Sequence, residues 1–145
     1  MKKPNIFKDD GCLYIYRFAR FILPYHKQLA FFIARLNQIF YGAYISPKAN
    51  IGNIYITHSV GLVIGSGIKI ENGCRLYHNI TIGSGKNNKS NIHIKRNTTI
   101  YTNSVIVGEL TIGENCIIGA GSYIDKNIKN NTKIFPKIKM VKVEK

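Results

Sequence analysis

The sequence IGSGIKIENGCRLYHNITI, residues 64–82, places a branched or long aliphatic residue at every sixth position. The spacing continues to Ile124, with a single interruption between Ile82 and Ile94. The ten residues that keep this period are Ile64, Ile70, Leu76, Ile82, Ile94, Ile100, Ile106, Ile112, Ile118 and Ile124. A fixed period over this many units is an internal repeat, and a repeat decides the fold ahead of local propensity.

Three positions after each aliphatic residue stands, in nine of ten cases, a residue type that tolerates a positive φ angle. These ten positions are Gly67, Gly73, Asn79, Gly85, Asn97, Asn103, Glu109, Asn115, Gly121 and Asn127. Glycine and asparagine accept the left-handed conformation more readily than other residues, so each hexamer is predicted to end in a tight turn. Two positions before the aliphatic residues, small residues such as Cys74, Thr98 and Ser104 are predicted to fill a crowded inner corner.

This pattern excludes the common alternatives. An amphipathic helix would need apolar residues three and four apart, and a hairpin meander would alternate strictly between longer turns. A six-residue unit with one inward aliphatic residue and one turn instead forms one face of a triangular coil. Three units complete one turn of a parallel β-helix, which stacks on the next turn at about 4.8 Å.

The 145 residues suit one repeat domain with a short appendage. Residues 1–43 are predicted to form an amphipathic helical segment, and residues 44–136 a β-helix of about five coils. A polar loop at 83–93 interrupts the β-helix, and residues 137–145 form a basic tail. Loops that project from a rigid scaffold often carry function, which makes residues 83–93 a candidate region.

The N-terminal segment contains two apolar patterns with a helical period, joined at Pro24. The predicted apolar faces consist of Ile15, Phe18, Ala19 and Ile22, and of Leu29, Phe32, Ile33, Leu36 and Phe40. One reading is that these helices cover the end of the β-helix or a neighbouring subunit. The other is that residues 12–41, rich in aromatic and basic side chains, contact the membrane interface.

Composition limits the class of partner and the compartment. Twenty-one Lys and Arg against seven Asp and Glu give a net charge of +14, which favours an anionic partner unless it only reflects a Lys-rich composition. No stacking platform or recognition helix predicts a nucleic-acid partner. No window is long and apolar enough for a membrane span, and Pro4, Asn5 and Asp9 argue against an export signal, so a cytoplasmic protein is expected.

The cysteines and histidines give different indications. Cys12, Cys74 and Cys116 are far apart and lack metal-ligand spacing, so neither a disulfide framework nor a zinc ribbon is expected. Counting corners without the loop places Ile56, Leu76, Ile100 and Ile118 on one edge of the prism, and two positions past them stand His58, His78, Thr102 and Ala120. The two histidines should therefore stack one coil apart, and histidine is the natural base near neutral pH.

Four segments resemble, in order and spacing, the serine-acetyltransferase branch of the hexapeptide-repeat acyltransferases. They are THSVGLVIG at 57–65, ITIGSGK at 80–86, LTIGEN at 110–115 and IGAGS at 118–122. The resemblance covers about residues 43–127. It implies a left-handed β-helix, a homotrimer, and acetyl-CoA as acyl donor in a groove between adjacent prisms, with no metal.

The resemblance also implies roles for individual residues. His58 would be the general base, and backbone N–H groups from Gly83 to Gly85 would stabilise the oxyanion. The residues implied for the cofactor are Gly83, Gly85, Thr102, Asn103, Gly119, Ala120 and Lys137. Those implied for the acceptor are His78, Ser84, Asn91 and His93.

Several positions depart from the pattern that this branch carries. Thr57 and Tyr44 stand where acidic residues are expected, and Ser90-Asn91 where an Arg-His pair is expected, with His93 two positions later. The usual closing V-x-G-x-P-A is replaced by IFPK at 134–137. A free amino acid needs a cation for its carboxylate and an anion for its ammonium group, and these positions supply neither.

The departures favour a sugar or surface-polysaccharide hydroxyl as acceptor, as in the polysaccharide O-acetyltransferases of the same superfamily. Three alternatives stay open. One is a serine O-acetyltransferase with a rearranged loop, and another is a non-catalytic β-helix that serves as a binding module. The third, a zinc-dependent carbonic-anhydrase-like β-helix, needs three imidazoles around a metal, and its H-x4-H pair is missing.

Overall fold

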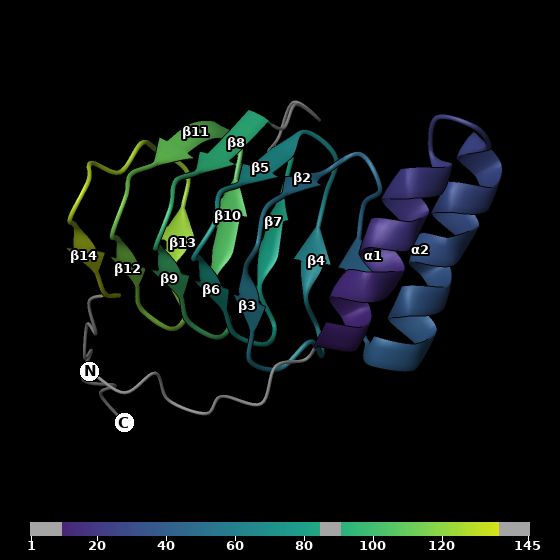
Figure 1. The fold of residues 1–145 in the computed structure, drawn as a ribbon. Coiled ribbons are helices and arrows are strands. Elements are labelled where there is room, and N and C mark those ends of the chain that lie inside the picture. The colour runs from purple at the N-terminus through teal and green to yellow at the C-terminus, as the bar shows by residue number, and fades with distance from the viewer. Residues whose placement is uncertain (1–9, 85–90, 137–145) are drawn as a thin grey trace, which may run out of the picture.

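The computed structural model describes residues 10–84 and 91–136. Its body is a left-handed parallel β-helix with two helices at its N-terminal end, which confirms the predicted fold class (Figure 1). Helix α1 spans Asp10–Ile22 and helix α2 spans Lys27–Tyr41. In the described part of the chain, no helix has the length and apolar character needed to cross a membrane.

Three parallel sheets form the faces of the prism. Sheet A contains β1 (Tyr44–Ile45), β4 (Val63–Ile64), β7 (Thr81–Gly83), β10 (Val105–Val107) and β13 (Tyr123–Ile124). Sheet B contains β2 (Asn50–Ile51), β5 (Ile68–Ile70), β8 (Asn91–Ile94) and β11 (Glu109–Ile112). Sheet C contains β3 (Tyr55–Ile56), β6 (Arg75–Leu76), β9 (Thr99–Ile100), β12 (Ile117–Ile118) and β14 (Lys133–Ile134).

The repeating aliphatic residues stack in register inside the prism. In sheet A, Ile82 pairs with Ile64 on one side and with Ile106 on the other, and all three are fully buried. Sheet C has an equivalent column through Leu76 and Ile100. Because one aliphatic side chain of each strand points inward, three short strands per coil suffice to build a continuous apolar core.

Most of the predicted tight turns are present at the expected residues. Asn79, Asn97, Asn103, Asn115, Gly67, Gly73 and Gly121 all have positive φ angles. Two predicted positions are wrong: Glu109 begins strand β11 while Gly108 takes the turn, and Asn127 has no positive φ. Instead, the Asn127 side chain accepts a hydrogen bond from the Thr111 N–H at 2.8 Å, so it closes its corner with the side chain. Gly85 lies outside the described residues.

Small polar residues occupy the inner corners and bind backbone carbonyl groups. The Thr98 hydroxyl donates to the carbonyl oxygen of Gly113 at 2.8 Å, and the Ser122 hydroxyl donates to that of Gly119 at 2.6 Å. The Cys74 thiol donates to the Lys95 carbonyl oxygen at 3.1 Å, and burial raises its pKa to about 11. These corners therefore satisfy carbonyl groups that the turns remove from the sheet ladders.

The two helices cover the first coil of the prism (Figure 1). The Tyr16 hydroxyl donates to the Ala49 carbonyl oxygen at 2.7 Å and accepts from the Ile51 N–H at 3.2 Å. The Arg20 guanidinium also donates to the Ala49 carbonyl oxygen. Burial raises the pKa of Tyr16, so its hydroxyl stays protonated as the donor. These contacts satisfy backbone groups at the edge of β2, which an uncovered β-helix would leave unpaired.

Of the predicted apolar faces of the two helices, only Ala19 and Ile33 are buried. Helix α1 buries Cys12, Leu13, Tyr16 and Ala19, and helix α2 buries Ala30, Ile33, Ala34 and Asn37. Phe18, Phe32 and Phe40 from the predicted faces are exposed by 56%, 56% and 71%. Small residues let the helices approach each other closely, and an amide links them, since the Asn37 side chain donates to the Cys12 carbonyl oxygen at 3.0 Å.

The stacked core makes a direct stability prediction. Ile82→Ala should reduce the free energy of unfolding by about 2–5 kcal/mol, because Ile82 is fully buried between two other isoleucines. Val63→Ala, an apolar truncation at a residue that is 38% exposed, is the matched control and should cost about 0.5 kcal/mol or less. Denaturant unfolding measures both, and equal effects would contradict the inward column.

Candidate active site at the corner between sheets C and A

His58 and His78 lie one above the other where sheet C turns toward sheet A. The Thr57 N–H donates to the Leu76 carbonyl oxygen at 2.9 Å, which fixes the register of the two strand ends. The ring centroids of His58 and His78 are 5.9 Å apart, and the rings meet edge to face at 63°. His58 is exposed and His78 is half-buried. The structure thus brings together the two histidines that the corner count placed on one edge.

The segment after His58 is anchored to the end of helix α2. The Ser59 hydroxyl donates to the Tyr41 carbonyl oxygen at 2.8 Å, and the Gly61 N–H donates to the Gly42 carbonyl oxygen at 2.9 Å. Gly61 has a φ of 73°, and a β-carbon there would collide with the side chain of Asn79. This anchored turn holds His58 at the edge of the prism and explains the break in the six-residue period between Ile56 and Ile64.

Three buried polar atoms without a hydrogen-bond partner gather at this corner. They are Thr57 Oγ1, His78 Nδ1 and Thr102 Oγ1, on successive coils, and within the described residues only Asn37 Oδ1 shares this property. A buried polar atom left unpaired costs about 1–3 kcal/mol, so native structures rarely keep several together. Their concentration beside His58 is the property expected of a site that binds a polar ligand.

Below the histidines, the edge continues with Thr102 and then Ala120. Thr102 is half-buried, whereas Asn103 and Ala120 are exposed. Gly119 is buried, and a β-carbon on it would collide with the ring of Phe135. The packing of Phe135 therefore explains why position 119 is a glycine. The family resemblance instead assigns Gly119 to the cofactor site. Lys137 lies outside the described residues.

The residues around the loop lie across sheet A from His58. Gly83 ends strand β7, which separates His78 from Ser84, and Asn91 begins β8 in sheet B. Within one prism, the structure therefore does not bring Ser84 or Asn91 beside the two histidines. Residues 85–90, with Gly85 and Ser90, lie outside the described part of the chain.

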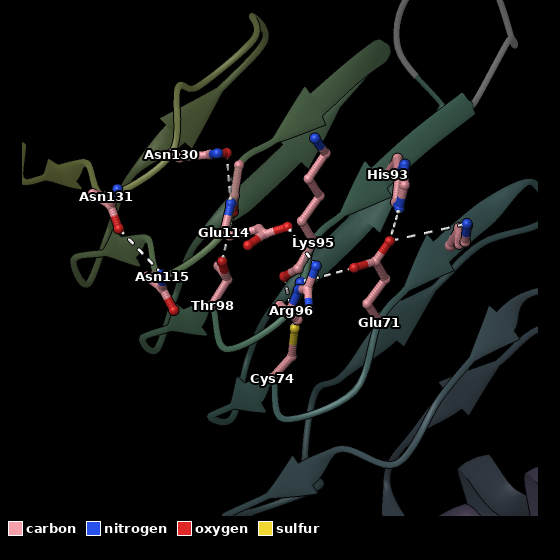
Figure 2. A network of polar contacts seen from close by, with 12 residues as sticks. Glu71, Cys74, His93, Lys95, Arg96, Thr98, Glu114, Asn115, Asn130 and Asn131 are labelled. Atoms are coloured by element: carbon pink, nitrogen blue, oxygen red, sulfur yellow. Dashed lines mark hydrogen bonds and ion pairs between the residues drawn. The ribbon is translucent and has the colours of Figure 1, made fainter.

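His93 belongs to a separate polar network on the outer face of sheet B (Figure 2). Its Nε2 atom lies 2.7 Å from the Glu71 carboxylate, which also accepts from the Arg96 N–H at 3.1 Å. The Arg96 guanidinium lies 3.1 Å from the Glu114 carboxylate. The hydrogen bond from His93 lowers the pKa of Glu71, and the Arg96 N–H acts in the same direction.

The sequence did not predict this network, because its residues meet only through the pairing of β5 with β8. Glu71 follows β5 and His93 lies within β8, so only the observed pairing of these strands, with Lys69 opposite His93, shows that the two side chains meet. The pocket beside it, lined in part by Asn50, Lys69, Glu71 and Arg96, has a volume of about 300 Å³ and lies away from His58. Among the described residues, no group of three or more His, Cys, Asp or Glu side chains is placed to hold a metal ion.

Comparison with known proteins gives consistent results. A family model described as "Bacterial transferase hexapeptide (six repeats)" matches residues 91–126. The serine acetyltransferase of Buchnera aphidicola subsp. Schizaphis graminum is 34% identical over 127 residues, covering 83% of this chain and 48% of the relative. That of Bacillus subtilis is 35% identical over 106 residues, covering 68% of this chain and 49% of the relative.

Solved structures agree with these relatives. Serine acetyltransferase isoform 3 of Entamoeba histolytica, solved in complex with cysteine, superimposes with a TM-score of 0.85 at 29% identity. The match covers 92% of this chain and 49% of that one. The chain spans about half the length of the curated relatives it matches.

The predicted sugar or polysaccharide acceptor is wrong. The matching relatives are named serine acetyltransferases, which supports the alternative acceptor, serine. The prediction relied on four positions at which this chain lacks the charged residues of the resembling family. Such a comparison does not count charged groups that other parts of a site supply, so it could not exclude an amino-acid acceptor.

The Glu71 network predicts a pH dependence of stability. Because its pKa in the folded protein lies below the ordinary value of 4.5, Glu71 contributes stability above that pH and loses it as the pH falls through the folded pKa. Glu71→Gln should therefore destabilise the protein near neutral pH by less than about 1 kcal/mol, as for exposed ion pairs. The difference from the unmodified protein should shrink as the solution is acidified.

Urea unfolding across the acid range measures this effect. Glu109→Gln is the matched control, because it removes a carboxylate that is exposed at the start of β11. A Glu71→Gln effect that stays constant with pH would contradict the assigned role of the carboxylate.

Proposed function

We propose that the chain is a hexapeptide-repeat transferase, and that it is a serine O-acetyltransferase that uses acetyl-CoA as acyl donor. The observation that carries the proposal is the exposed imidazole of His58, which meets the His78 ring edge to face at a corner that also holds the unpaired Thr57 and Thr102 hydroxyls. The names of the relatives supply the acceptor.

In this mechanism His58 acts as general base. Its imidazole removes the proton from the serine hydroxyl as the hydroxyl oxygen attacks the thioester carbonyl carbon. The tetrahedral intermediate then collapses, the carbon–sulfur bond breaks, and the imidazolium returns the proton to the leaving thiolate. The products are O-acetylserine and CoA. Backbone N–H groups near Gly83 are the candidates for stabilising the oxyanion.

His78 is proposed to orient both the base and the acceptor. Its ring meets the His58 ring edge to face, which limits the orientations open to that imidazole. Its buried Nδ1 atom lacks a partner in the described structure and is available to bind a polar group of the acceptor. Thr102, one coil further along the same edge, offers a hydroxyl to the arm of the cofactor.

The separation of the candidate residues favours a site shared between copies of the chain. His58 lies on one side of sheet A, and Ser84 and Asn91 lie on the other. A neighbouring prism could place its own loop corner beside His58, which a single prism does not do. We therefore propose a homotrimer with one site between each pair of adjacent prisms.

Acetyl transfer to L-serine tests the proposal directly. The protein should release CoA from acetyl-CoA in the presence of L-serine, and His58→Ala should lower kcat by about 10²–10⁴-fold with little change in KM. His26→Asn is the matched control, because it removes a histidine but keeps an acceptor at the N-cap of α2, where His26 binds the Leu29 N–H.

Two results would overturn this assignment. Retention of more than half the activity by His58→Ala would remove His58 from the mechanism. Binding of acetyl-CoA without turnover of L-serine would exclude serine as the acceptor. A thiol assay for released CoA, combined with direct detection of O-acetylserine, separates these cases.

The proposed assembly predicts the mass in solution. With a chain of 16.4 kDa, light scattering should give the mass of three chains at micromolar concentration. If the site is shared, mixing His58→Ala with Asn91→Ala subunits should restore some activity, because one of the mixed interfaces has both residues intact. A monomer with full activity would contradict the shared site.

A further inference from the structure

The helical cap, residues 11–41, exposes most of the large apolar side chains found on the surface. Of thirteen exposed large apolar residues in the described chain, eight lie in this cap. They are Tyr14, Phe18, Phe21, Tyr25, Leu29, Phe32, Ile39 and Phe40. Tyr25, Ile39 and Phe40 are each exposed by more than 70%. Single exposed apolar residues are ordinary, but a concentration on one short element indicates an interaction surface.

The exposed residues of α2 form a continuous stripe. Leu29, Phe32, Ile39 and Phe40 recur at helical spacing around the half-buried Leu36, and the neighbouring face of the helix contributes Ala30, Ile33, Ala34 and Asn37 to the interior. The helix is therefore amphipathic in an unusual sense, because its small residues pack inward and its larger ones face outward. Within the described structure nothing covers this stripe.

The same region is predominantly basic. The two helices and the turn between them, residues 10–41, contain four Lys and Arg residues and one acidic residue, Asp10. Arg17, Lys27 and Arg35 are exposed on the two helices. Arg20 differs, because it binds the Ala49 carbonyl oxygen at the end of the prism. Cations that flank exposed aromatic rings are the side chains typical of helices that lie in the interface of an anionic bilayer.

A groove beside the stripe combines the two properties. Phe31, Ile39 and Tyr44 line it with apolar surface, and Arg35 and Gln38 add polar groups. Its volume is about 660 Å³. A guanidinium next to apolar walls fits an anionic headgroup with its acyl chain, because phosphate oxygens accept hydrogen bonds from arginine while the chain contacts the rings.

A second copy of the chain suits this surface poorly. Two caps that met face to face would bring the same basic side chains together, and each cap has four Lys and Arg residues against one acidic residue, Asp10. Unpaired like charges at an interface oppose association. An anionic surface instead attracts the same residues.

We propose that the helical cap docks onto the surface of an anionic lipid bilayer, with α1 and α2 parallel to the membrane plane. The exposed aromatic residues enter the headgroup region, and Arg17, Lys27 and Arg35 bind lipid phosphates. The prism then projects away from the bilayer, because the cap lies at one end of it (Figure 1). This inference is independent of the proposed acetyl transfer.

Vesicle sedimentation with the full chain tests the proposal. The protein should bind vesicles of phosphatidylcholine mixed with phosphatidylglycerol and bind phosphatidylcholine alone much more weakly. Arg17→Gln with Arg35→Gln should weaken binding about thirtyfold, since each basic residue at an anionic surface contributes roughly fivefold. Phe21→Ser with Phe32→Ser should weaken it at least about tenfold through lost apolar contact.

Matched controls distinguish a specific surface from net charge. Lys126→Gln with Lys129→Gln removes the same charge at the far end of the prism, and Tyr123→Ser removes an aromatic residue that is 66% exposed there. Both should leave binding unchanged, and circular dichroism should confirm that every variant is folded. Failure to bind anionic vesicles, or equal loss in the lysine control, would overturn the proposal. So would a fall in oligomer mass in the Phe21→Ser, Phe32→Ser variant without vesicles, because the face would then be occupied by a second copy.

Discussion

The in-register stacking of one buried aliphatic side chain per strand is the constraint on which the rest of this molecule depends. A two-residue strand forms too few hydrogen bonds to be stable alone, and each becomes stable only because the coils on either side bury its isoleucine. The register is strict, since a shift of one residue would turn every aliphatic side chain outward. Polar residues at the inner corners then complete the hydrogen bonding that the turns interrupt.

The register of the strands also positions the candidate catalytic residues. His58 and His78 are twenty residues apart, yet their rings meet because Ile56 and Leu76 pair in sheet C. The same pairing continues the edge to Thr102 through Ile100. The deviation from the period at His58 gives that residue its exposure, because the chain leaves sheet C early and is fastened to the end of α2 by Ser59 and Gly61. The six-residue period thus places His58, His78 and Thr102 along one edge, and the local departure from that period exposes His58.

The fold and the histidine column could be predicted because a period of six has few structural solutions. The helix faces could not, because apolar spacing shows which residues share a side but not whether that side meets the protein. In this chain, Ala30 and Ala34 allow closer packing than Phe32 does. The Glu71–His93 contact depended on which strands pair across the loop, and the acceptor depended on groups beyond the positions that matched the resembling family. Local sequence contains neither kind of information.

The two ends of the prism differ, and this difference gives the molecule a direction. The first coil is closed by Tyr16 and Arg20, whereas among the described strands β14 pairs with β12 alone. In a stack where each coil contacts only its neighbours, the coil with one neighbour opens most often. Transient fraying should therefore start near Ile134 and reach the Ala120 and Thr102 levels before it reaches His58. A groove along this edge would be rigid near the helices and would open transiently near Ile134. A long ligand would therefore be released first from the end near Ile134.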